Sequence, residues 1–215
     1  MSKPKLALIP SGYKSGTVYS ILPNDGTGDF DYERDGNASR VRKDGLIEEL
    51  TVDDTPRLDW LNSNCPSLLL EPQRTNLLKY SEDYSQSEWS KIRTTISTDQ
   101  SIAPDGTFTA DKIIASTDNN THRCDQVITL TDAATYSLSF FAKANEYNCI
   151  RASIGQSGLT FGNVASFNLD TQSVSTIGTI ENAEIVDFGN GWFRCILTMD
   201  AETTDRVVIG LGNNN

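Results

Sequence analysis

Residues 135–144, TYSLSFFAKA, decide the fold class of this 215-residue chain. Apolar and polar side chains alternate along this stretch, so that one face carries Tyr136, Leu138, Phe140 and Ala142. The opposite face carries Ser137, Ser139, Phe141 and Lys143. Successive side chains of a β-strand point to opposite faces, whereas a helix repeats about every 3.6 residues. The alternation therefore predicts a strand whose first face lies in a hydrophobic core and whose second face lies outside it.

Similar short stretches occur on both sides of this one, at intervals of roughly ten residues. We expect strands at residues 110–115, 124–130, 149–154, 165–169, 171–180, 183–188, 192–199 and 206–211. Turn-forming residues separate these strands, and no helix longer than a single turn at residues 81–89 is indicated. Closely spaced short strands with turns between them are typical of a β-sandwich or a barrel, so the chain is predicted to be all-β.

The N-terminal third has a different pattern, in which still shorter apolar runs are broken by Pro, Gly, Asn and Asp. We expect short strands at residues 5–9, 17–22, 29–34, 39–42 and 46–52. Strands of this length bury little apolar surface unless they pair with a partner surface. Residues 1–75 are therefore predicted to be an irregular N-terminal segment for attachment or oligomerisation, and residues 76–215 to be the β-sandwich.

Residues 68–89, LLLEPQRTNLLKYSEDYSQSEW, connect these two parts. The apolar start of this stretch leads into an irregular segment, whose backbone polar groups need partners. We expect a structural clamp there, formed by Glu71, Arg74, Thr75 and Asn76. In this interpretation Arg74 donates to nearby carbonyls, and the short polar side chains close local turns. The alternative is that Arg74 contacts a partner protein.

The balance of charges disfavours two classes of partner. Lys and Arg total 18 against 29 Asp and Glu, which gives a formal net charge of −11. An acidic chain does not attract phosphate backbones or anionic lipids, so neither nucleic acid nor a membrane is predicted as a partner. The N-terminal apolar run at residues 6–9 is too short for a signal sequence or a membrane span, which predicts a soluble protein made in a cytoplasm.

Residue types that commonly hold metals are present without a recognisable arrangement. The four cysteines show no CxxC or Cys/His spacing, and we expect free, partly buried thiols. No acidic stretch matches the calcium-loop pattern, so no metal or other cofactor is predicted. A structural calcium ion is the alternative, with these candidate ligands: Asp25, Asp29, Asp31, Asp105, Asp111 and Asp118.

Catalysis finds little support in the sequence. The single histidine, His122, lies in a polar segment without a nucleophile motif. A glycosidase needs two facing carboxylates, and nothing selects such a pair among the 29 acidic residues. The chain is therefore predicted not to be an enzyme.

Four aromatic residues are candidates for stacking against a sugar, namely Trp192, Phe141, Tyr147 and Phe161. Sugar C–H surfaces are apolar, and glycan sites combine flat aromatic faces with a few polar groups that set orientation. Trp192 and Phe141 fall on strand faces opposite the main apolar set. The alternative is that both faces of the sandwich are covered, and that Trp192 packs in the core or at its rim.

Three blocks of the sequence carry a resemblance to a known class of proteins. The first comprises ASRV at residues 38–41, DGLIE at 44–48 and TPRLD at 55–59. The second comprises Cys65-Pro66, LLLEPQRTNL at 68–77 and YSED at 80–83. The third comprises APDG at 103–106, ADK at 110–112, YSLS at 136–139 and NGWFR at 190–194. On these blocks the chain resembles bacteriophage tail-fibre and head-fibre proteins that carry a jelly-roll domain similar to carbohydrate-binding modules.

The resemblance implies a jelly-roll β-sandwich in a virion structural protein, a fibre or appendage subunit made in the host cytoplasm. It implies other virion proteins of the tail or capsid as partners, and a homo-oligomer with a trimer as one option. Such proteins continue into one more strand after the position of Leu211, so either the chain is a fragment or a neighbouring chain completes the sheet. The alternative functions are a receptor-recognition module that binds a host-surface glycan and, after it, a polysaccharide depolymerase.

Overall fold

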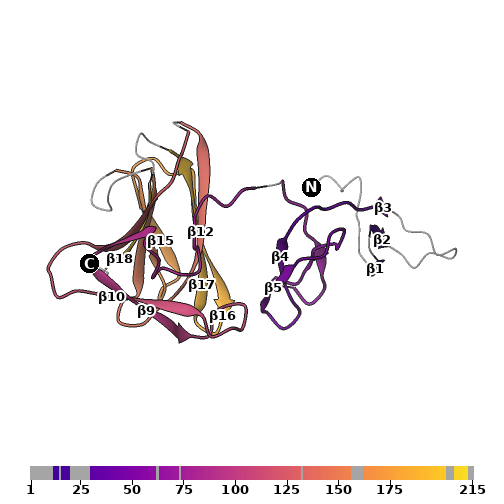
Figure 1. Ribbon diagram of the computed structural model, residues 1–215, viewed down its shortest axis with the longest axis horizontal. Helices are drawn as coiled ribbons and strands as arrows, with labels where there is room; N and C mark the ends of the chain where they lie inside the picture. Colours follow the sequence, from indigo (N-terminus) through magenta and orange to yellow (C-terminus); the bar gives the residue numbers. More distant parts are fainter. Residues whose placement is uncertain are drawn as a thin grey trace. The chain divides into compact units, whose positions relative to one another are not determined.

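The computed structural model contains only β-strands as regular elements within the residues that it describes (Figure 1). These residues are 12–14, 16–19, 30–61, 63–72, 74–131, 133–155, 162–201 and 206–212, with backbone alone at 12–14, 17–19, 30 and 31. The predicted all-β class is confirmed. No helix in the described ranges is long and apolar enough to cross a membrane. The strand expected at residues 5–9 lies outside these ranges.

The chain separates into two compact units, residues 1–74 (unit 1) and residues 75–215 (unit 2). The division falls between Arg74 and Thr75, next to the boundary at residue 75 that the sequence predicts. Each unit has its own sheets, because every strand in the described ranges pairs with strands of the same unit.

Unit 1 consists of small antiparallel sheets of short strands. A three-stranded sheet contains β1 (Gly12–Lys14), β2 (Thr17–Tyr19) and β3 (Phe30–Asp31). Two further pairs are β4 (Ala38–Val41) with β5 (Ile47–Leu50), and β6 (Leu58–Asp59) with β7 (Ser67–Leu68). The buried apolar residues described in this unit are few: Val41, Leu50 and Pro56. A hydrophobic core of this size supplies little stability by itself.

Polar side chains hold the short strands of unit 1 together. Asp59 is 9% exposed, and its carboxylate accepts hydrogen bonds from the backbone N–H groups of Val41, at 2.7 Å, and Leu61, at 3.0 Å. Arg57 donates to the carbonyl of Ser39 at 2.8 Å and forms a 2.6 Å ion pair with Glu71. These bonds join β4, β6 and the segment after β7, so polar contacts supplement the small apolar core.

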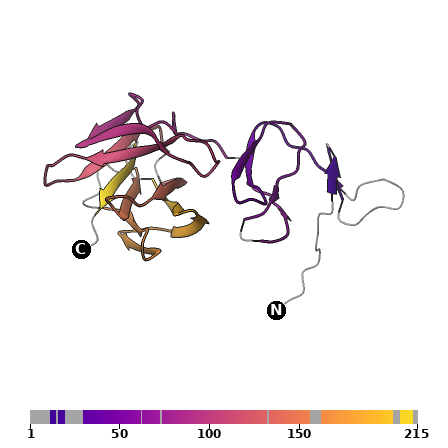
Figure 2. The same cartoon turned by 90° about the horizontal axis from the view of Figure 1, so that it is seen from below.

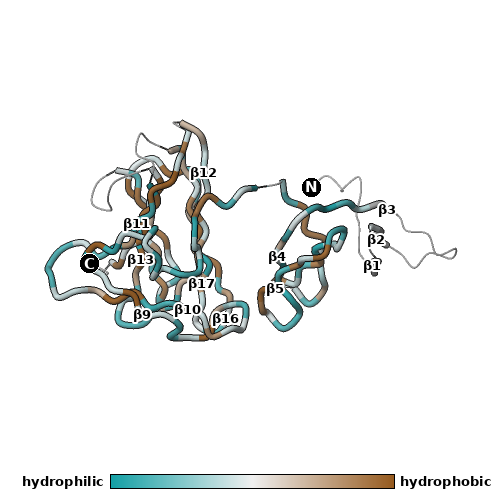
Figure 3. Tube along the Cα trace, in the orientation of Figure 1, coloured by the Kyte–Doolittle hydropathy of each residue, from teal (hydrophilic) through white to brown (hydrophobic). Residues whose placement is uncertain are grey.

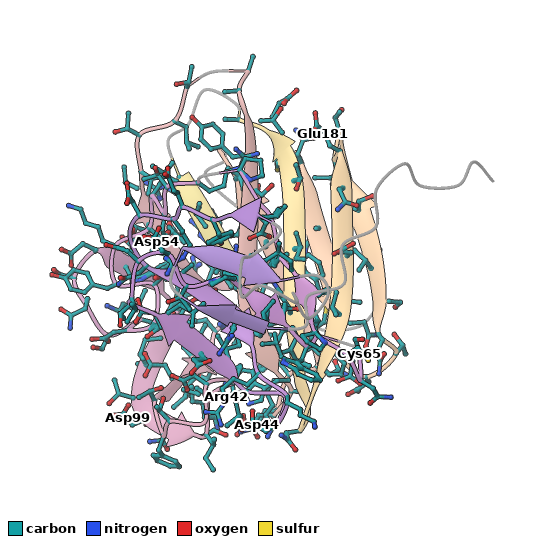
Figure 4. All side chains as sticks on the ribbon, turned by 90° about the vertical axis from the view of Figure 1, so that its right-hand side faces the viewer. Arg42, Asp44, Asp54, Cys65, Asp99 and Glu181 are labelled. Carbon is teal, nitrogen blue, oxygen red and sulfur yellow. The ribbon has the colours of Figure 1, made fainter. Side chains whose placement is uncertain are left out.

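The β4–β5 hairpin closes through a turn at Asp44-Gly45. The N–H of Arg42 donates to the carbonyl of Leu46 at 2.8 Å, and the N–H of Gly45 donates to the carbonyl of Arg42 at 3.0 Å. Figure 4 shows the Arg42 and Asp44 side chains beside each other at this turn, where they form a 2.6 Å ion pair. Both side chains are about half exposed, and an ion pair of this kind contributes little to stability.

Unit 2 is built around an antiparallel six-stranded sheet with the order β15-β14-β13-β18-β11-β8. Its strands are β8 (Trp89–Ile92), β11 (His122–Val127), β13 (Cys149–Ile154), β14 (Val164–Asn168), β15 (Ser173–Ile177) and β18 (Arg206–Gly212). The last of them in the sequence, β18, lies inside the sheet and pairs with β13 on one side and β11 on the other.

A second group of strands lies opposite this sheet (Figure 2). It contains a three-stranded sheet with the order β12-β17-β16 and a hairpin of β9 and β10. These strands are β9 (Thr94–Ser101), β10 (Ala110–Ala115), β12 (Thr135–Lys143), β16 (Asn182–Gly189) and β17 (Trp192–Asp200).

The hydrophobic core of unit 2 lies between the two layers, which makes the unit a β-sandwich. Leu197 and Met199 of β17 are fully buried against residues of the other layer that include Trp89 of β8 and Phe167 of β14. The ring of Phe140 meets that of Phe167 edge-on, with 5.8 Å between centroids. Figure 3 shows hydrophobic and hydrophilic residues alternating along these strands.

The face assignment made for residues 135–144 is confirmed. Leu138 and Ala142 are each 5% exposed within the core, and Tyr136 and Phe140 pack against it. The predicted free thiols are also confirmed: Cys124, Cys149 and Cys195 are buried, and Cys65, labelled in Figure 4, is exposed.

Candidate functional site

Two of the aromatic candidates lie on the outer face of the three-stranded sheet. Phe141 on β12 and Trp192 on β17 are half-buried and lie outside the core cluster. The ring of Phe141 meets that of Phe188 edge-on at 4.9 Å. This outer face therefore carries a patch of aromatic side chains, as the strand pattern predicts.

Contacts across the sheet fix the position of Trp192. Its indole N–H donates to the carbonyl of Ile102, in the turn after β9, at 2.9 Å. The ammonium group of Lys143, directly opposite on β12, lies 6.0 Å from the centre of the indole ring. The indole is only partly buried, and an aromatic ring that is fixed in place and partly exposed can stack against a sugar or a cation.

The other two aromatic candidates are not part of this patch. Tyr147 lies in the turn between β12 and β13 and lines a hollow on the outer face of the six-stranded sheet. Phe161 lies outside the described residues. The structure therefore places the three described candidates on two different surfaces.

The hollow has a volume of about 670 Å³. Its floor includes Arg151 on β13, Ser166 on β14 and Ser175 on β15, which pair directly across neighbouring strands. These three residues lie on the outward-facing side of their strands, whereas the alternating residues Ala152, Ala165 and Phe167 point into the core. Tyr147 and the polar segment 116–121 form part of its wall.

Two residues of the hollow belong to types that often act in catalysis. His122 is 8% exposed, and its Nδ1 atom lies 3.1 Å from the carbonyl oxygen of Arg93. Burial raises the pKa of the Cys149 thiol above its usual value, and the positive charge of Arg151 offsets part of this rise in pKa. A thiol with a raised pKa is mostly neutral near pH 7 and is a weak nucleophile. The lining therefore offers hydrogen-bond donors and acceptors more clearly than a reactive centre.

Contacts are described for two of the residues predicted to form a clamp. Glu71 pairs with Arg57. Arg74 and Thr75 are exposed. The side-chain oxygen of Asn76 accepts a 3.0 Å bond from the N–H of Leu78, which closes a local turn.

Arg57 and Asp59 were missed as the polar residues that join the strands of unit 1. They lie on either side of Leu58, with Asp59 in the two-residue strand β6 and Arg57 directly before it. The PRLD pattern at 56–59 is the signal that could have revealed them.

The calcium candidates that the structure describes have protein partners. Asp105 accepts from the N–H of Thr107, Asp111 accepts from the N–H of Tyr84, and Asp118 accepts from the hydroxyl of Ser116. Asp25, Asp29 and the side chain of Asp31 lie outside the description. Within the described residues no group of three His, Cys, Asp or Glu side chains could hold a metal ion.

Comparisons with protein-family models and with curated proteins found no match to this chain. The features that bear on function are therefore the two-unit organisation and the two surfaces of unit 2, the aromatic patch and the polar hollow.

Proposed function

We propose that the chain is a non-enzymatic structural subunit of a bacteriophage fibre or other appendage. Unit 1 attaches the subunit to other virion proteins or to sister subunits, and unit 2 presents a β-sandwich of the jelly-roll type outward. The observation that carries this proposal is the division of the chain into two compact units with unlike stabilisation.

The strands of unit 1 support an attachment role. Strands β3, β6 and β7 each contain only 2 residues, and the sheets contain 2 or 3 strands. Edge strands of such sheets present backbone N–H and C=O groups that can pair with a strand of another chain. In a symmetric oligomer, sister subunits supply that strand in the same way to each other.

The proposal is tested by following incorporation into particles. Tagged full-length chain and tagged fragment 75–215 are expressed during infection by a phage that lacks its own copy, and the particles are purified. We expect only the full-length chain to sediment with the particles, while circular dichroism shows the fragment to be folded. Equal incorporation of the fragment, or absence of both chains from the particles, would overturn the proposed role of unit 1.

A second candidate function is recognition of a host-surface glycan, and the aromatic patch favours it. The half-buried Trp192 and Phe141 lie on an outer sheet face beside Lys143, and that face combines aromatic and polar groups as sugar sites do. Trp192→Ala should abolish binding on a glycan array.

Trp60→Ala is the matched control. Trp60 is also half-buried and also has a lysine nearby, with the ammonium group of Lys43 at 5.5 Å from its ring, but it lies in unit 1. Binding that survives Trp192→Ala would remove the aromatic patch from this function. Release of new reducing ends from a bound polysaccharide would instead favour a depolymerase.

A further inference from the structure

We propose that the polar hollow on the six-stranded sheet is a binding site for an anionic sugar, with Arg151 as the residue that binds the negative group. This inference rests on the second candidate function, glycan recognition, but it assigns a different surface and a different ligand class. It does not depend on the aromatic patch of Trp192 and Phe141.

The bonding of the arginines sets Arg151 apart. The other half-buried arginines of the described chain each donate to a carboxylate, a carbonyl or a hydroxyl group: Arg34, Arg40, Arg57, Arg123, Arg194 and Arg206. Arg151 is also half-buried, yet within the described residues its guanidinium has no hydrogen bond and no ion pair. A partly desolvated guanidinium that keeps its donors free is suited to bind an anion from outside the chain.

The neighbouring strand holds the stem of Arg151 in place. A Cβ atom at position 212 would stand 3.1 Å from Cγ and 3.2 Å from Cδ of Arg151, so the stem lies directly over Gly212. Gly210 is the residue paired with Arg151 on β18. Because neither position of β18 carries a side chain, the arginine lies against the sheet, and less side-chain entropy is lost when a ligand binds.

The lining around Arg151 is suited to a sugar. Ser166 and Ser175 continue the row from Arg151 across the sheet, and their hydroxyls both donate and accept. Tyr147 adds an aromatic ring at the wall. The carboxylate of Asp118, which also lines the hollow, already accepts a 2.9 Å bond from Ser116. The volume of about 670 Å³ lies within the usual range for small-ligand sites.

A carboxylate or a phosphate accepts two parallel N–H bonds from a guanidinium, and the sugar hydroxyls would reach the serines. Glucuronic acid and glucose 6-phosphate therefore share the recognised chemistry, while glucose lacks it. The acidic chain as a whole repels anions at long range, so the selectivity for a charged sugar must come from this local contact.

The test is an NMR titration of the ¹⁵N-labelled full chain with glucuronic acid, glucose 6-phosphate, glucose and inorganic phosphate at constant ionic strength. Either anionic sugar should give saturable shifts at the amides of Tyr147, Arg151, Ser166 and Ser175, with at least roughly ten-fold tighter binding than glucose. Tighter binding of glucuronic acid would assign the carboxylate as the recognised group, and tighter binding of glucose 6-phosphate would assign the phosphate.

Arg151→Gln should weaken this binding by at least roughly ten-fold. Arg194→Gln is the matched control, because Arg194 is a half-buried arginine on the outer face of the other sheet, and binding should be unchanged. Arg151→Lys keeps the charge but loses the fork of donors, so it should also weaken binding and serves if the glutamine variant does not fold.

The outcomes separate this inference from glycan recognition in general. Shifts by glucose that centre on Trp192 and survive Arg151→Gln would overturn the anionic-sugar site while supporting the aromatic patch. Inorganic phosphate that binds as tightly as the sugars would overturn the assignment to sugars. Absence of saturable shifts with either anionic sugar would overturn the site altogether.

Discussion

Asp125 is the most deeply buried member of the ion pairs described in the β-sandwich. It is 1% exposed on β11, and its two carboxylate oxygens bind Arg123 at 2.9 Å and Arg206 at 2.7 Å. The pair of cations compensates the cost of burying one carboxylate, and β18 is joined to β11 through this contact. Removing the acid would leave two positive groups facing each other without a counter-charge.

We therefore expect Asp125→Ala to lower the free energy of unfolding by about 3 kcal/mol. Glu146→Ala provides the comparison in the same unit, because Glu146 pairs with Lys112 while 63% exposed, and its loss should lower stability far less than the loss of Asp125. Urea denaturation followed by tryptophan fluorescence measures both values. Equal losses in the two variants would show that the ion triad contributes no more than a surface pair.

The raised pKa of the Cys195 thiol predicts how the free energy of unfolding changes at alkaline pH. Burial, with a smaller contribution from Cys149, raises the pKa of the Cys195 thiol from 9.0 to about 12. Below pH 9 the thiol is neutral in both states, so its favourable burial is fully present. Above that pH the unfolded chain loses the thiol proton while the folded chain keeps it, so stability falls as the pH rises toward 12.

Cys195→Val removes this titration and keeps an apolar side chain on the strand. The slope of unfolding free energy between pH 9 and pH 12 should become shallower by at most about 1.4 kcal/mol per pH unit. Denaturant curves at several pH values give the slopes. Identical slopes for the variant and the parent would contradict a raised pKa at this position.

Among the connections between strands, the turn after β15 requires a glycine at position 178. Gly178 has φ of +78°, and a Cβ atom there would overlap the side-chain oxygen of Asn163 and stand 2.9 Å from the carbonyl oxygen of Gly162. That same Asn163 oxygen accepts a 2.6 Å bond from the N–H of Thr179. The turn therefore depends on glycine for both its backbone angle and its space.

Gly178→Ala should lower the unfolding free energy by about 3 kcal/mol. Gly189→Ala separates the two causes, because Gly189 has φ of +80° but no atom within 4 Å of a built Cβ. That variant should cost only about 1 kcal/mol, the contribution of the backbone angle. Thermal unfolding by calorimetry would show the difference, and equal shifts in Tm would contradict the steric clash at Gly178.

Strands with alternating apolar residues could be predicted from the sequence. On β17, which was expected as a strand at residues 192–199, every second residue is buried, namely Phe193, Cys195, Leu197 and Met199. The strand β9, TTISTDQS, was not predicted, because its polar residues give no alternation over most of its length. It is a strand because β10 pairs with it and because Ile96 packs against the core.

Pairing between distant strands could not be predicted, and both candidate sites depend on it. In the sequence, Arg151, Ser166 and Ser175 are recognisable only as outward-facing polar residues of three separate strands. Their convergence requires the register of β13, β14 and β15, which sequence periodicity does not specify. The bond from Trp192 to the carbonyl of Ile102 spans 90 residues and has no local signal.

In the molecule as a whole, we expect residues 75–215 to fold without residues 1–74. The core of unit 2 consists of its own residues, from Trp89 to Ile209, and its sheets use only its own strands. The isolated fragment should unfold cooperatively, with a free energy within about 1 kcal/mol of the corresponding transition in the full chain. A fragment without a cooperative transition would contradict the division into independent units.

The proposed role as a structural subunit of a phage appendage can be tested by locating and counting the chain in purified particles, by antibody–gold electron microscopy and quantitative mass spectrometry. We expect a fixed copy number per particle that matches the symmetry of the appendage, with gold on that appendage. Particles that contain none of this chain would contradict it.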